Sequence, residues 1–451
     1  MVRSVTRTGA LDPSTIQDWT RAHVLVSWSA QKNLSPVPIV EAHGATLVGA
    51  DGSTYLDFSS GLINVNLGHG HPRVVRAIQE QVARLCYVTP SFASDARAAL
   101  ARALYEVSPG QGLTKTLFTT GGGEANDHAI KIARMVTGRL KILTAYRSFH
   151  GASYGAITAS GDNRRWASEP GISGVVRFFG PYPYRSPFNT PPEAEAAAAL
   201  RHLEDVLHYE GPQNVAAVLL EPVIGTNGVI VPPDGYLQGV RDLCTRHGIL
   251  LIVDEVMVGF GRTGRWWGCE HWGIVPDMLV FAKGVTSGYI PLGGVSVSPG
   301  VASYFDDHTL WAGLTYSGHP LACAAGVAAV AAYQENGLIE RARQIGEGLA
   351  MALRGLQDRH PSVGDVRGLG LFYAIELVKD RKTREMLVPW NNPGQGVMAE
   401  ITRDLLKRGV YVYGRWNILF VAPPLIITEE EIGRAAEALD GALDIADRAA
   451  G

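Results

Sequence analysis

The sequence predicts an α/β fold in which helices cover both faces of a mostly parallel sheet. Through the middle of the 451-residue chain, short and continuously apolar runs alternate with segments of helical spacing. Such runs are typical of parallel strands, because both faces of a parallel sheet are buried. Apolar residues make up 46% of the chain and charged residues 18%, so a large core is expected and disorder is not.

The elements are expected in a regular order along the chain. An alternating stretch over 43–60 predicts an antiparallel meander. Six apolar runs are strand candidates for the central sheet: 115–120, 141–146, 215–223, 249–256, 278–283 and 293–298. Helical spacing is found over 124–136, 193–209 and 235–247. A helix near 337–358, strands around 369–377 and 410–421, and a helix from Thr428 predict a smaller α+β unit, which the meander could join.

Charge and cysteine usage exclude several classes of function. With 40 basic and 43 acidic residues the net charge is −3, so no nucleic-acid partner is expected. The four cysteines have no CxxC or metal-ligand spacing, so we expect neither disulfides nor a metal site. The longest stretch without Asp, Glu, Lys or Arg, 308–334, is broken by glycine and proline and does not predict a membrane span. A soluble, cytoplasmic protein is expected.

A cluster of three glycines marks the first candidate site. Glycine is abundant, with 52 of 451 residues, and Gly121–Gly123 lie in TTGGGEAND between an expected strand and an expected helix. Open backbone N–H groups and the helix dipole can bind an anion at such a turn. The segment has neither the P-loop lysine nor the GxGxxG pattern of dinucleotide-binding turns. Taken alone, a flexible strand-to-helix turn is the simpler interpretation.

An acid and a lysine follow two of the most apolar strand candidates. Asp254 ends ILLIVD, and Lys283, the only lysine between Lys141 and Lys379, ends MLVFAK. A buried acid needs a cation or donor nearby, and a desolvated lysine with a lowered pKa reacts with carbonyl groups. A solvent-facing carboxylate and a surface lysine are the alternatives. The carboxyl ends of parallel strands line the ligand crevice, so the glycine turn, the acid and the lysine could converge there. A pyridine ring that carries a phosphate and an aldehyde needs these three partners.

Six motifs, in this order, resemble the class III aminotransferases, or ω-transaminases, which are pyridoxal-phosphate enzymes of fold type I. The resemblance covers about residues 40 to 435. Within the family, the sequence is loosely similar to members that use taurine or β-alanine. The resemblance is carried by FTTGGGEAND (118–127), SFHGASYGA (148–156), EPVIGTNG (221–228), VDEVMVGFGRTG (253–264), FAKGVTSGYIPLGG (281–294) and TYSGHPLACAAG (315–326). It implies a large pyridoxal-phosphate domain at 67–318, and a small domain made of 1–66 and 319–451.

The resemblance also implies roles for individual residues. Lys283 would form the Schiff base with pyridoxal phosphate and move the proton at the substrate carbon. Asp254 would pair with the protonated pyridine nitrogen, and His150 and Glu221 would lie near the ring. The reaction would be a ping-pong transfer of an amino group from an ω-amino acid or amine to pyruvate or 2-oxoglutarate.

Further residues would contact the cofactor according to the same resemblance. Gly122 and Gly123 would bind its phosphate through backbone N–H groups, in a turn where serines are usual at 121 and 123. Phe149, in place of the commoner tyrosine, would stack on the ring, with Val256 on the opposite face. Thr315 would reach the phosphate from the partner subunit, so a homodimer, or a tetramer built from it, is expected.

Substrate recognition is predicted from fewer observations. Many family members carry a mobile arginine for the acceptor's carboxylate, and an ungapped count back from Pro423 places Tyr413 there. Arg415 lies two residues later on the same face of a strand and could serve instead; a surface ion pair is the alternative. The expected pocket wall is apolar and would favour a donor without a second charge: Leu62, Tyr87, Phe149 and Trp416.

Two other functions are open at this point. The first keeps the fold and cofactor and changes the reaction to an aminomutase, racemase or decarboxylase. The second is a catalytically inactive scaffold of the same fold, against which the intact Lys283 and Asp254 argue. A nicotinamide dehydrogenase is disfavoured, because no GxGxxG follows a strand.

Overall fold

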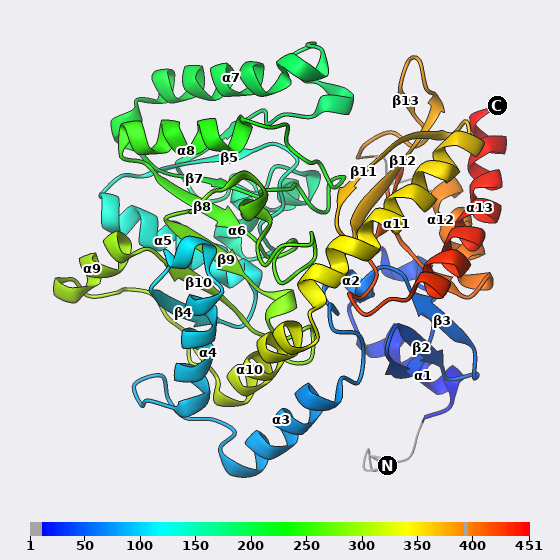
Figure 1. Ribbon diagram of the computed structural model, residues 1–451, viewed down its shortest axis with the longest axis horizontal. Helices are drawn as coiled ribbons and strands as arrows, with labels where there is room; N and C mark the ends of the chain where they lie inside the picture. The colour runs from blue at the N-terminus through cyan, green and yellow to red at the C-terminus, as the bar shows by residue number, and fades with distance from the viewer. Residues whose placement is uncertain (1–10, 392–395) are drawn as a thin grey trace.

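A seven-stranded sheet forms the centre of the larger part of the molecule (Figure 1). The computed structural model describes residues 11–391 and 396–451. Strand β10 runs antiparallel to both of its neighbours, and the other paired strands are parallel. The predicted, mostly parallel sheet is therefore confirmed. Its spatial order is β4 (Lys115–Thr119), β10 (Gly293–Val297), β9 (Met278–Phe281), β8 (Leu250–Asp254), β7 (Val215–Leu220), β5 (Lys141–Ala145) and β6 (Val175–Phe178).

All six predicted strands of this sheet are present, and β6 is an additional one. This edge strand has four residues, of which only Phe178 is buried, and Arg177 interrupts its apolar run. A short edge strand leaves one side without a neighbouring strand, so it needs no continuous apolar sequence. For that reason the sequence pattern did not reveal it.

Alternate residues of the sheet belong to two separate apolar cores. On β7, Ala217 and Leu219 pack into one core, and Val218 and Leu220 pack into the other. The first core also contains side chains from α5 (Gly122–Thr137), α6 (Tyr154–Ala159) and α9 (Pro299–Asp307). The second contains side chains from α4 (Asp95–Glu106), α7 (Glu195–Glu210) and α8 (Tyr236–His247). Helices therefore cover both faces, as predicted.

The smaller part combines both ends of the chain. A meander of β1 (Ile39–His43), β2 (Thr46–Gly49) and β3 (Thr54–Asp57) pairs in parallel with β14 (Val410–Tyr411), so the 43–60 segment joins the C-terminal unit as predicted. A second sheet contains β11 (Val363–Leu369), β12 (Phe372–Asp380), β13 (Glu385–Met386), β15 (Tyr413–Arg415) and β16 (Ile418–Val421).

Two of the predicted C-terminal strands are wrong in extent. The range 369–377 crosses a hairpin turn, because Gly370 has φ +58° and separates β11 from β12. The range 410–421 is three short strands, and the turn between the last two contains Trp416 at φ +52°. The predicted helices are confirmed as α11 (Leu338–Arg359) and α13 (Glu429–Ala450), the latter capped by Thr428. The other helices are α1 (Pro13–His23), α2 (Ser60–Ile63), α3 (Pro72–Arg84), α10 (Pro320–Glu335) and α12 (Gly396–Lys407).

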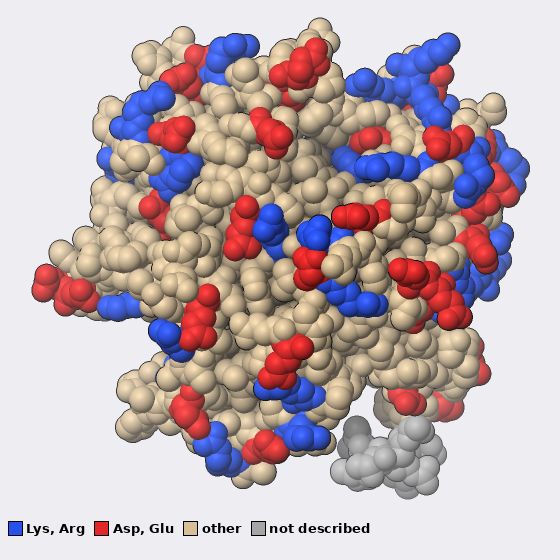
Figure 2. Space-filling model, viewed as in Figure 1, with Lys and Arg blue, Asp and Glu red and all other residues tan. Residues whose placement is uncertain are grey.

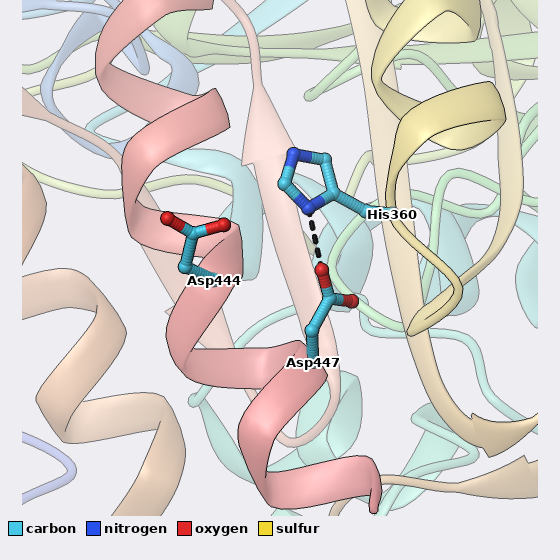
Figure 3. Close-up of side chains that lie close together, drawn as sticks. All are labelled: His360, Asp444 and Asp447. Atoms are coloured by element: carbon cyan, nitrogen blue, oxygen red, sulfur yellow. Dashed lines mark hydrogen bonds and ion pairs between the residues drawn. The ribbon is translucent and has the colours of Figure 1, made fainter.

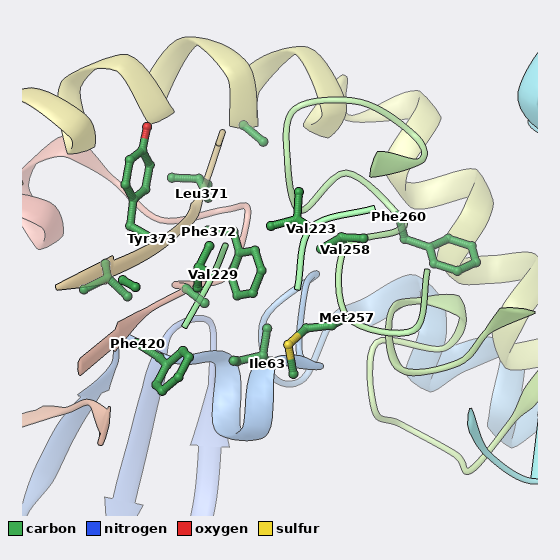
Figure 4. Packing of buried hydrophobic residues seen from close by; sticks show 14 of the residues in the cluster. Ile63, Val223, Val229, Met257, Val258, Phe260, Leu371, Phe372, Tyr373 and Phe420 are labelled. Atoms are coloured by element: carbon green, nitrogen blue, oxygen red, sulfur yellow. The ribbon is translucent and has the colours of Figure 1, made fainter. Parts of the chain in front are cut away.

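The two parts share one apolar core (Figure 4). Ile63 of α2, Phe260 of the loop after β8, Phe372 of β12 and Phe420 of β16 are each at most 1% exposed. Because these side chains come from both parts, the parts are packed together over the loops that follow β7 and β8. Those loops also form the edge of the central sheet that carries the candidate site.

A buried arginine crosses the same junction. The Arg262 guanidinium, at 0% exposure, donates hydrogen bonds to Asn66 Oδ1 (2.7 Å), Ser60 Oγ (3.1 Å) and the Leu371 carbonyl (3.1 Å). It also donates to the Pro423 carbonyl. One side chain from the larger part thus satisfies acceptors on the N-terminal and C-terminal segments.

In the described residues no helix has the length and the apolar character needed to cross a membrane. On the face in Figure 2, basic and acidic side chains are interspersed instead of gathered into a patch of one sign. This distribution agrees with the net charge of −3.

The Arg262 junction predicts a large loss of stability in Arg262→Met. Several buried acceptors would lose their donor, so we expect the free energy of unfolding to fall by about 3 kcal/mol or more. The matched control is Arg343→Met, because Arg343 is 53% exposed and its loss should change stability by only about 0.5 kcal/mol. Urea unfolding followed by circular dichroism measures both. Equal transition midpoints for Arg262→Met and the wild type would contradict this role.

Candidate active site

A cavity of about 350 Å³ lies at the edge of the sheet where the parallel strands end. Carboxyl ends of parallel strands meet at one edge, so residues far apart in the sequence converge there. Eight of the predicted site residues line this cavity: Gly122, Gly123, Phe149, His150, Glu221, Asp254, Val256 and Lys283. They follow β4, β5, β7, β8 and β9, which places the glycine turn, the acid and the lysine in one site.

Lys283 lies directly after the fully buried β9 and has an unusual backbone conformation. Its φ is +48°, which costs about 1–3 kcal/mol for a residue other than glycine. The turn is held because the Lys283 carbonyl accepts the N–H groups of Thr286 and Gly288, both at 3.3 Å. Burial lowers the pKa of the amine to about 8. At pH 7 about one-tenth of the amine is therefore unprotonated and nucleophilic, far more than for a lysine with the ordinary pKa of about 10.4.

Asp254 is held by three donors at the end of β8. Its Oδ2 accepts hydrogen bonds from Asn126 Nδ2 and His150 Nδ1, both at 2.8 Å, and its Oδ1 accepts from the Val256 N–H at 3.0 Å. Because Asp254 is an acceptor, His150 carries its proton on Nδ1 in this contact. The carboxylate, 3% exposed, is thus fixed at the cavity wall and can pair with a cationic N–H of a ligand.

Glu221 is a second buried acid in the same wall. Its two oxygens accept the N–H groups of Phe149 (2.9 Å) and Gly225 (2.8 Å). Burial raises the pKa of its carboxyl to about 7, with Asp254 adding to that effect. Glu221 can therefore hold or release a proton near neutral pH beside Lys283 and Asp254.

The glycine turn forms one part of the cavity wall. Helix α5 begins here, and its N-cap Gly121 offers no side-chain hydrogen bond, so the N–H groups of the first turn have no side-chain cap. A Cβ at Gly122 would lie 2.8 Å from Val256 Cγ2, and one at Gly123 would lie 3.1 Å from Ser153 Oγ. The Ser153 hydroxyl is buried without a partner among the described residues. Unpaired donors and a turn that admits no side chain at Gly122 fit a phosphate group.

Three predicted site residues lie on the surface of this chain. Leu62 is 52% and Tyr87 41% exposed, and Thr315 is exposed as well. The Tyr87 hydroxyl donates to the Thr315 carbonyl at 3.0 Å, and its ring contacts Tyr316 edge-on at 6.2 Å. Leu62 lies on the distorted α2 and Tyr87 in the segment between α3 and α4, neither of which turns these side chains into the cavity. The chain therefore does not use them as walls of its own cavity.

Arg415 and Trp416 are buried beside the site instead of lining it. Arg415 Nη2 lies 3.4 Å from Asp162 Oδ2 and 3.2 Å from Asn163 Oδ1, and its guanidinium carbon lies 4.0 Å from the Trp416 ring centre. Trp416, 3% exposed, packs against Trp390 with ring centres 5.1 Å apart. Arg415 is 9% exposed, so its ion pair is an internal one and not the surface pair considered from the sequence.

Several residues of the site were not predicted. Asn126 lies inside the motif FTTGGGEAND, and its spacing of four from Gly122 on α5 could have suggested that it faces the same way. Thr226 was within another quoted motif. Arg164 belongs to no motif, yet its guanidinium carbon lies 3.4 Å from the centre of the Phe149 ring. Only the fold brings it there. The other cavity residues that were not predicted are Asn64, Thr120, Gly151, Met257, Ala282, Thr286, Gly288, Ile290, Pro291 and Leu292.

A separate cluster of ionisable side chains lies in the smaller part (Figure 3). His360, Asp444 and Asp447 have ligand-type atoms within 4.8 Å of one another. Asp447 accepts a hydrogen bond from His360 Nδ1 at 2.7 Å with one oxygen and two from Ser362 with the other. These bonds tie α13 to the segment between α11 and β11, which accounts for the cluster as a structural contact.

The chain is similar to known aminotransferases over nearly its whole length. Residues 28–443 match the family model described as "Aminotransferase class-III". The taurine–pyruvate aminotransferase of Bilophila wadsworthia is 33% identical over 434 residues, which is 91% of this chain and 93% of that protein. The putrescine–pyruvate aminotransferase of Pseudomonas aeruginosa is 32% identical over 432 residues, with 92% and 93% covered. The structure of taurine:2-oxoglutarate aminotransferase from Bifidobacterium kashiwanohense with PLP and glutamate has a TM-score of 0.95 and 42% identity, with 98% and 99% covered.

The lowered pKa of Lys283 predicts unusual reactivity. In protein freed of bound aldehydes with hydroxylamine, acetylation of Lys283 should follow a titration with a midpoint about pH 8. Free N-acetyl-lysine, with a pKa of about 10.4, is the reference. In Asp254→Asn the midpoint should fall further, because a nearby negative charge that stabilises the ammonium is lost. Peptide mapping by mass spectrometry gives the rates, and an upward shift in Asp254→Asn would contradict the arrangement.

Proposed function

The chain belongs to the class III aminotransferase family, and from this premise we propose how its own residues carry the reaction. The protein is a pyridoxal-phosphate-dependent transaminase of fold type I that transfers an amino group from an ω-amine donor to a keto acid. One observation carries the assignment of roles. A lysine amine without a hydrogen-bond partner among the described residues shares a cavity with a fully hydrogen-bonded aspartate.

The cavity fits the cofactor at three points. The open N–H groups at the start of α5 suit a phosphate, Asp254 suits a protonated ring nitrogen, and the Lys283 amine suits an aldehyde. When bound, pyridoxal phosphate supplies an aldehyde that takes up the amino group and a ring that accepts an electron pair. Phe149 and Val256 line the same cavity and are proposed to contact the two faces of that ring.

Lys283 is proposed to move the proton at the substrate carbon. Its pKa of about 8 suits this task, because a base works best when its pKa lies near the working pH. Asp254 keeps a negative charge at the ring nitrogen, and His150 and Asn126 hold it in place. Glu221 fixes the backbone at Phe149 and is proposed to exchange a proton near the ring, which its pKa of about 7 permits.

The substrates are proposed from the relatives named above together with the site. An ω-amino acid or a simple amine is the proposed donor, and pyruvate or 2-oxoglutarate the proposed acceptor, as the names of those relatives suggest. Arg415 is proposed to bind the acceptor's carboxylate after leaving Asp162. Its long contacts of 3.4 and 3.2 Å, to Asp162 and Asn163, support such a movement, since they are weaker than short ion pairs.

A homodimer with shared active sites is proposed for the working enzyme. Thr315 is exposed on its own chain, among exposed aromatic side chains that include Tyr316 (56%) and Trp311 (76%). A second copy covering this surface would bury these aromatics and bring the partner subunit's Thr315 to the phosphate end of the cavity. Tetramers built from such dimers are also compatible with the proposal.

The proposal extends to domains and location. The division into a large domain at 67–318 and a small one from 1–66 and 319–451 is supported by the separate sheets of the two parts. A cytoplasmic location is supported by four cysteines that form no disulfide with one another in the described residues.

A donor and acceptor panel tests the reaction. With 3-aminopropanoate or propylamine and either keto acid, we expect a new amino acid and a new carbonyl compound in equal amounts. The Lys283→Ala variant should lose this activity by at least about 10³-fold, because it removes both the nucleophile and the base. Chromatography of both products measures the balance. A rearranged, racemised or decarboxylated donor with no keto acid consumed would instead support the mutase, racemase or decarboxylase alternative.

Mixed dimers test the shared site. Lys283→Ala and Thr315→Glu should each be weakly active alone, since the first lacks the amine and the second puts a negative charge near the phosphate. Co-expressed with different tags, their heterodimer should recover about half of the wild-type activity, because one of its two sites has both an intact Lys283 and the partner subunit's Thr315. Heterodimers as inactive as the parents would show that Thr315 serves its own chain's site, and a fully active Thr315→Glu variant would show that it serves neither site.

A further inference from the structure

Arg164 contacts two residues of the cavity wall and belongs to none of the quoted family motifs. Its guanidinium carbon is 3.4 Å from the centre of the Phe149 ring and 5.3 Å from that of Trp28. Its Nη2 donates to Thr226 Oγ1 at 2.8 Å. Phe149 and Thr226 both line the cavity, so the guanidinium lies directly behind the cavity wall.

Two arginines share one carboxylate at this place. Asp162, fully buried, accepts from Arg164 Nε at 2.8 Å and from its Nη2, and also lies 3.4 Å from Arg415 Nη2. Among the described residues neither arginine has another acidic side chain within ion-pair distance. Arg164, Arg415 and Asp162 together therefore carry one positive charge that no acidic side chain among them balances. A largely buried surplus charge is unfavourable until an anion approaches it.

The free part of Arg164 is available to a ligand. Its Nε and Nη2 are used by Asp162 and Thr226, whereas Nη1 has no hydrogen-bond partner among the described residues. Nη1 is also absent from the fully buried unpaired atoms, and the side chain is 11% exposed. The bonds to Asp162 and the stack on Phe149 fix the guanidinium, so binding an anion would immobilise no further side chain.

We propose that Arg164 selects the donor by binding the distal acidic group, a sulfonate or a carboxylate, of an ω-amino acid. The inference rests on the proposed transamination and names the donor class for the same site. Asp162 is the positioning residue that holds Arg164 in place. This differs from the expectation of an apolar wall and an uncharged donor, because Leu62, Tyr87 and Trp416 are not in the cavity and a guanidinium is beside it.

Arg164 is better placed for the donor than Arg415. Within the described residues, the polar side-chain contacts of Arg415 are 3.4 and 3.2 Å long, and it packs on Trp416, which does not line the cavity. Arg164 contacts two cavity residues directly. A fixed arginine for the donor and a movable one for the acceptor would let one cavity accept two different acids in turn.

Kinetics of Arg164→Gln test the proposal. The ratio of kcat/KM for 3-aminopropanoate or 2-aminoethanesulfonate to that for propylamine should fall about 10- to 100-fold, the effect of losing one charged hydrogen bond. The control is Arg165→Gln, which removes the same charge one residue away. The Arg165 Nε pairs with Glu169 at 3.2 Å, and the side chain lines a different cavity, so its ratio should stay at the wild-type value.

Binding without turnover gives a second readout. Ethanesulfonate and propanoate carry the acid but no amine, and their dissociation constants with the holoenzyme are measured by calorimetry. Both should weaken about 10-fold or more in Arg164→Gln and less in Arg164→Lys, which keeps a charge but not the planar fork. A change for only one anion would restrict the donor to that acid.

The outcomes separate this inference from the proposed function. An unchanged donor ratio and unchanged anion binding in Arg164→Gln, with propylamine still transaminated, would overturn the role of Arg164 alone. A wild-type enzyme that transaminates no amine would overturn the proposed function. Thermal melting of each variant excludes misfolding, and if Arg164→Gln does not fold, Arg164→Lys with the same anions gives the decision.

Discussion

The buried carboxylate of Asp254 is the constraint on which the rest of the site depends. A carboxylate that is 3% exposed is tolerated only where donors replace its water, and His150, Asn126 and the Val256 N–H do so. These donors come from the segment after β5, from α5 and from the chain after β8 itself. The sheet order brings these segments together, so the position of one acid specifies how three elements must meet.

Charge balance extends this constraint across the cavity. The surroundings disfavour ionisation of both Lys283 and Glu221, because burial lowers the pKa of the lysine to about 8 and raises that of the glutamate to about 7. Two groups that both titrate near neutral pH can pass protons at little energetic cost. Beside the cavity wall positive charge is in excess, because Asp162 forms ion pairs with both Arg164 and Arg415. The interior therefore suits proton transfer, and the wall suits an anion.

Much of this site could be predicted from the sequence, for a physical reason. Asp254 ends the apolar strand β8, and Lys283 follows the apolar strand β9 by two residues. A charged residue at the end of such a run is easy to recognise in the sequence. Parallel strands end at the same edge of the sheet, so these residues lie at one site. Arg164 and Asp162 lie in and before a short 3-10 helix over 163–168, where no periodicity exists to read. Their relation to Phe149 is set by tertiary packing alone. The predicted strand over 369–377 crosses the β11–β12 turn, because apolar residues lie on both sides of Gly370 and the pattern does not reveal the turn.

The glycine-rich phosphate turn follows from the same packing. Gly122 cannot carry a side chain, because a Cβ would lie 2.8 Å from Val256, a residue that the cavity needs as a wall. Gly151, at φ +140°, approaches Gly123 so closely that a Cβ would lie 2.4 Å from its Cα. Two backbones therefore meet where a phosphate would bind, and Gly151 has no room for a substituent at the contact. Backbone N–H groups, with the buried Ser153 hydroxyl beside them, are the donors that this close approach leaves for an anion.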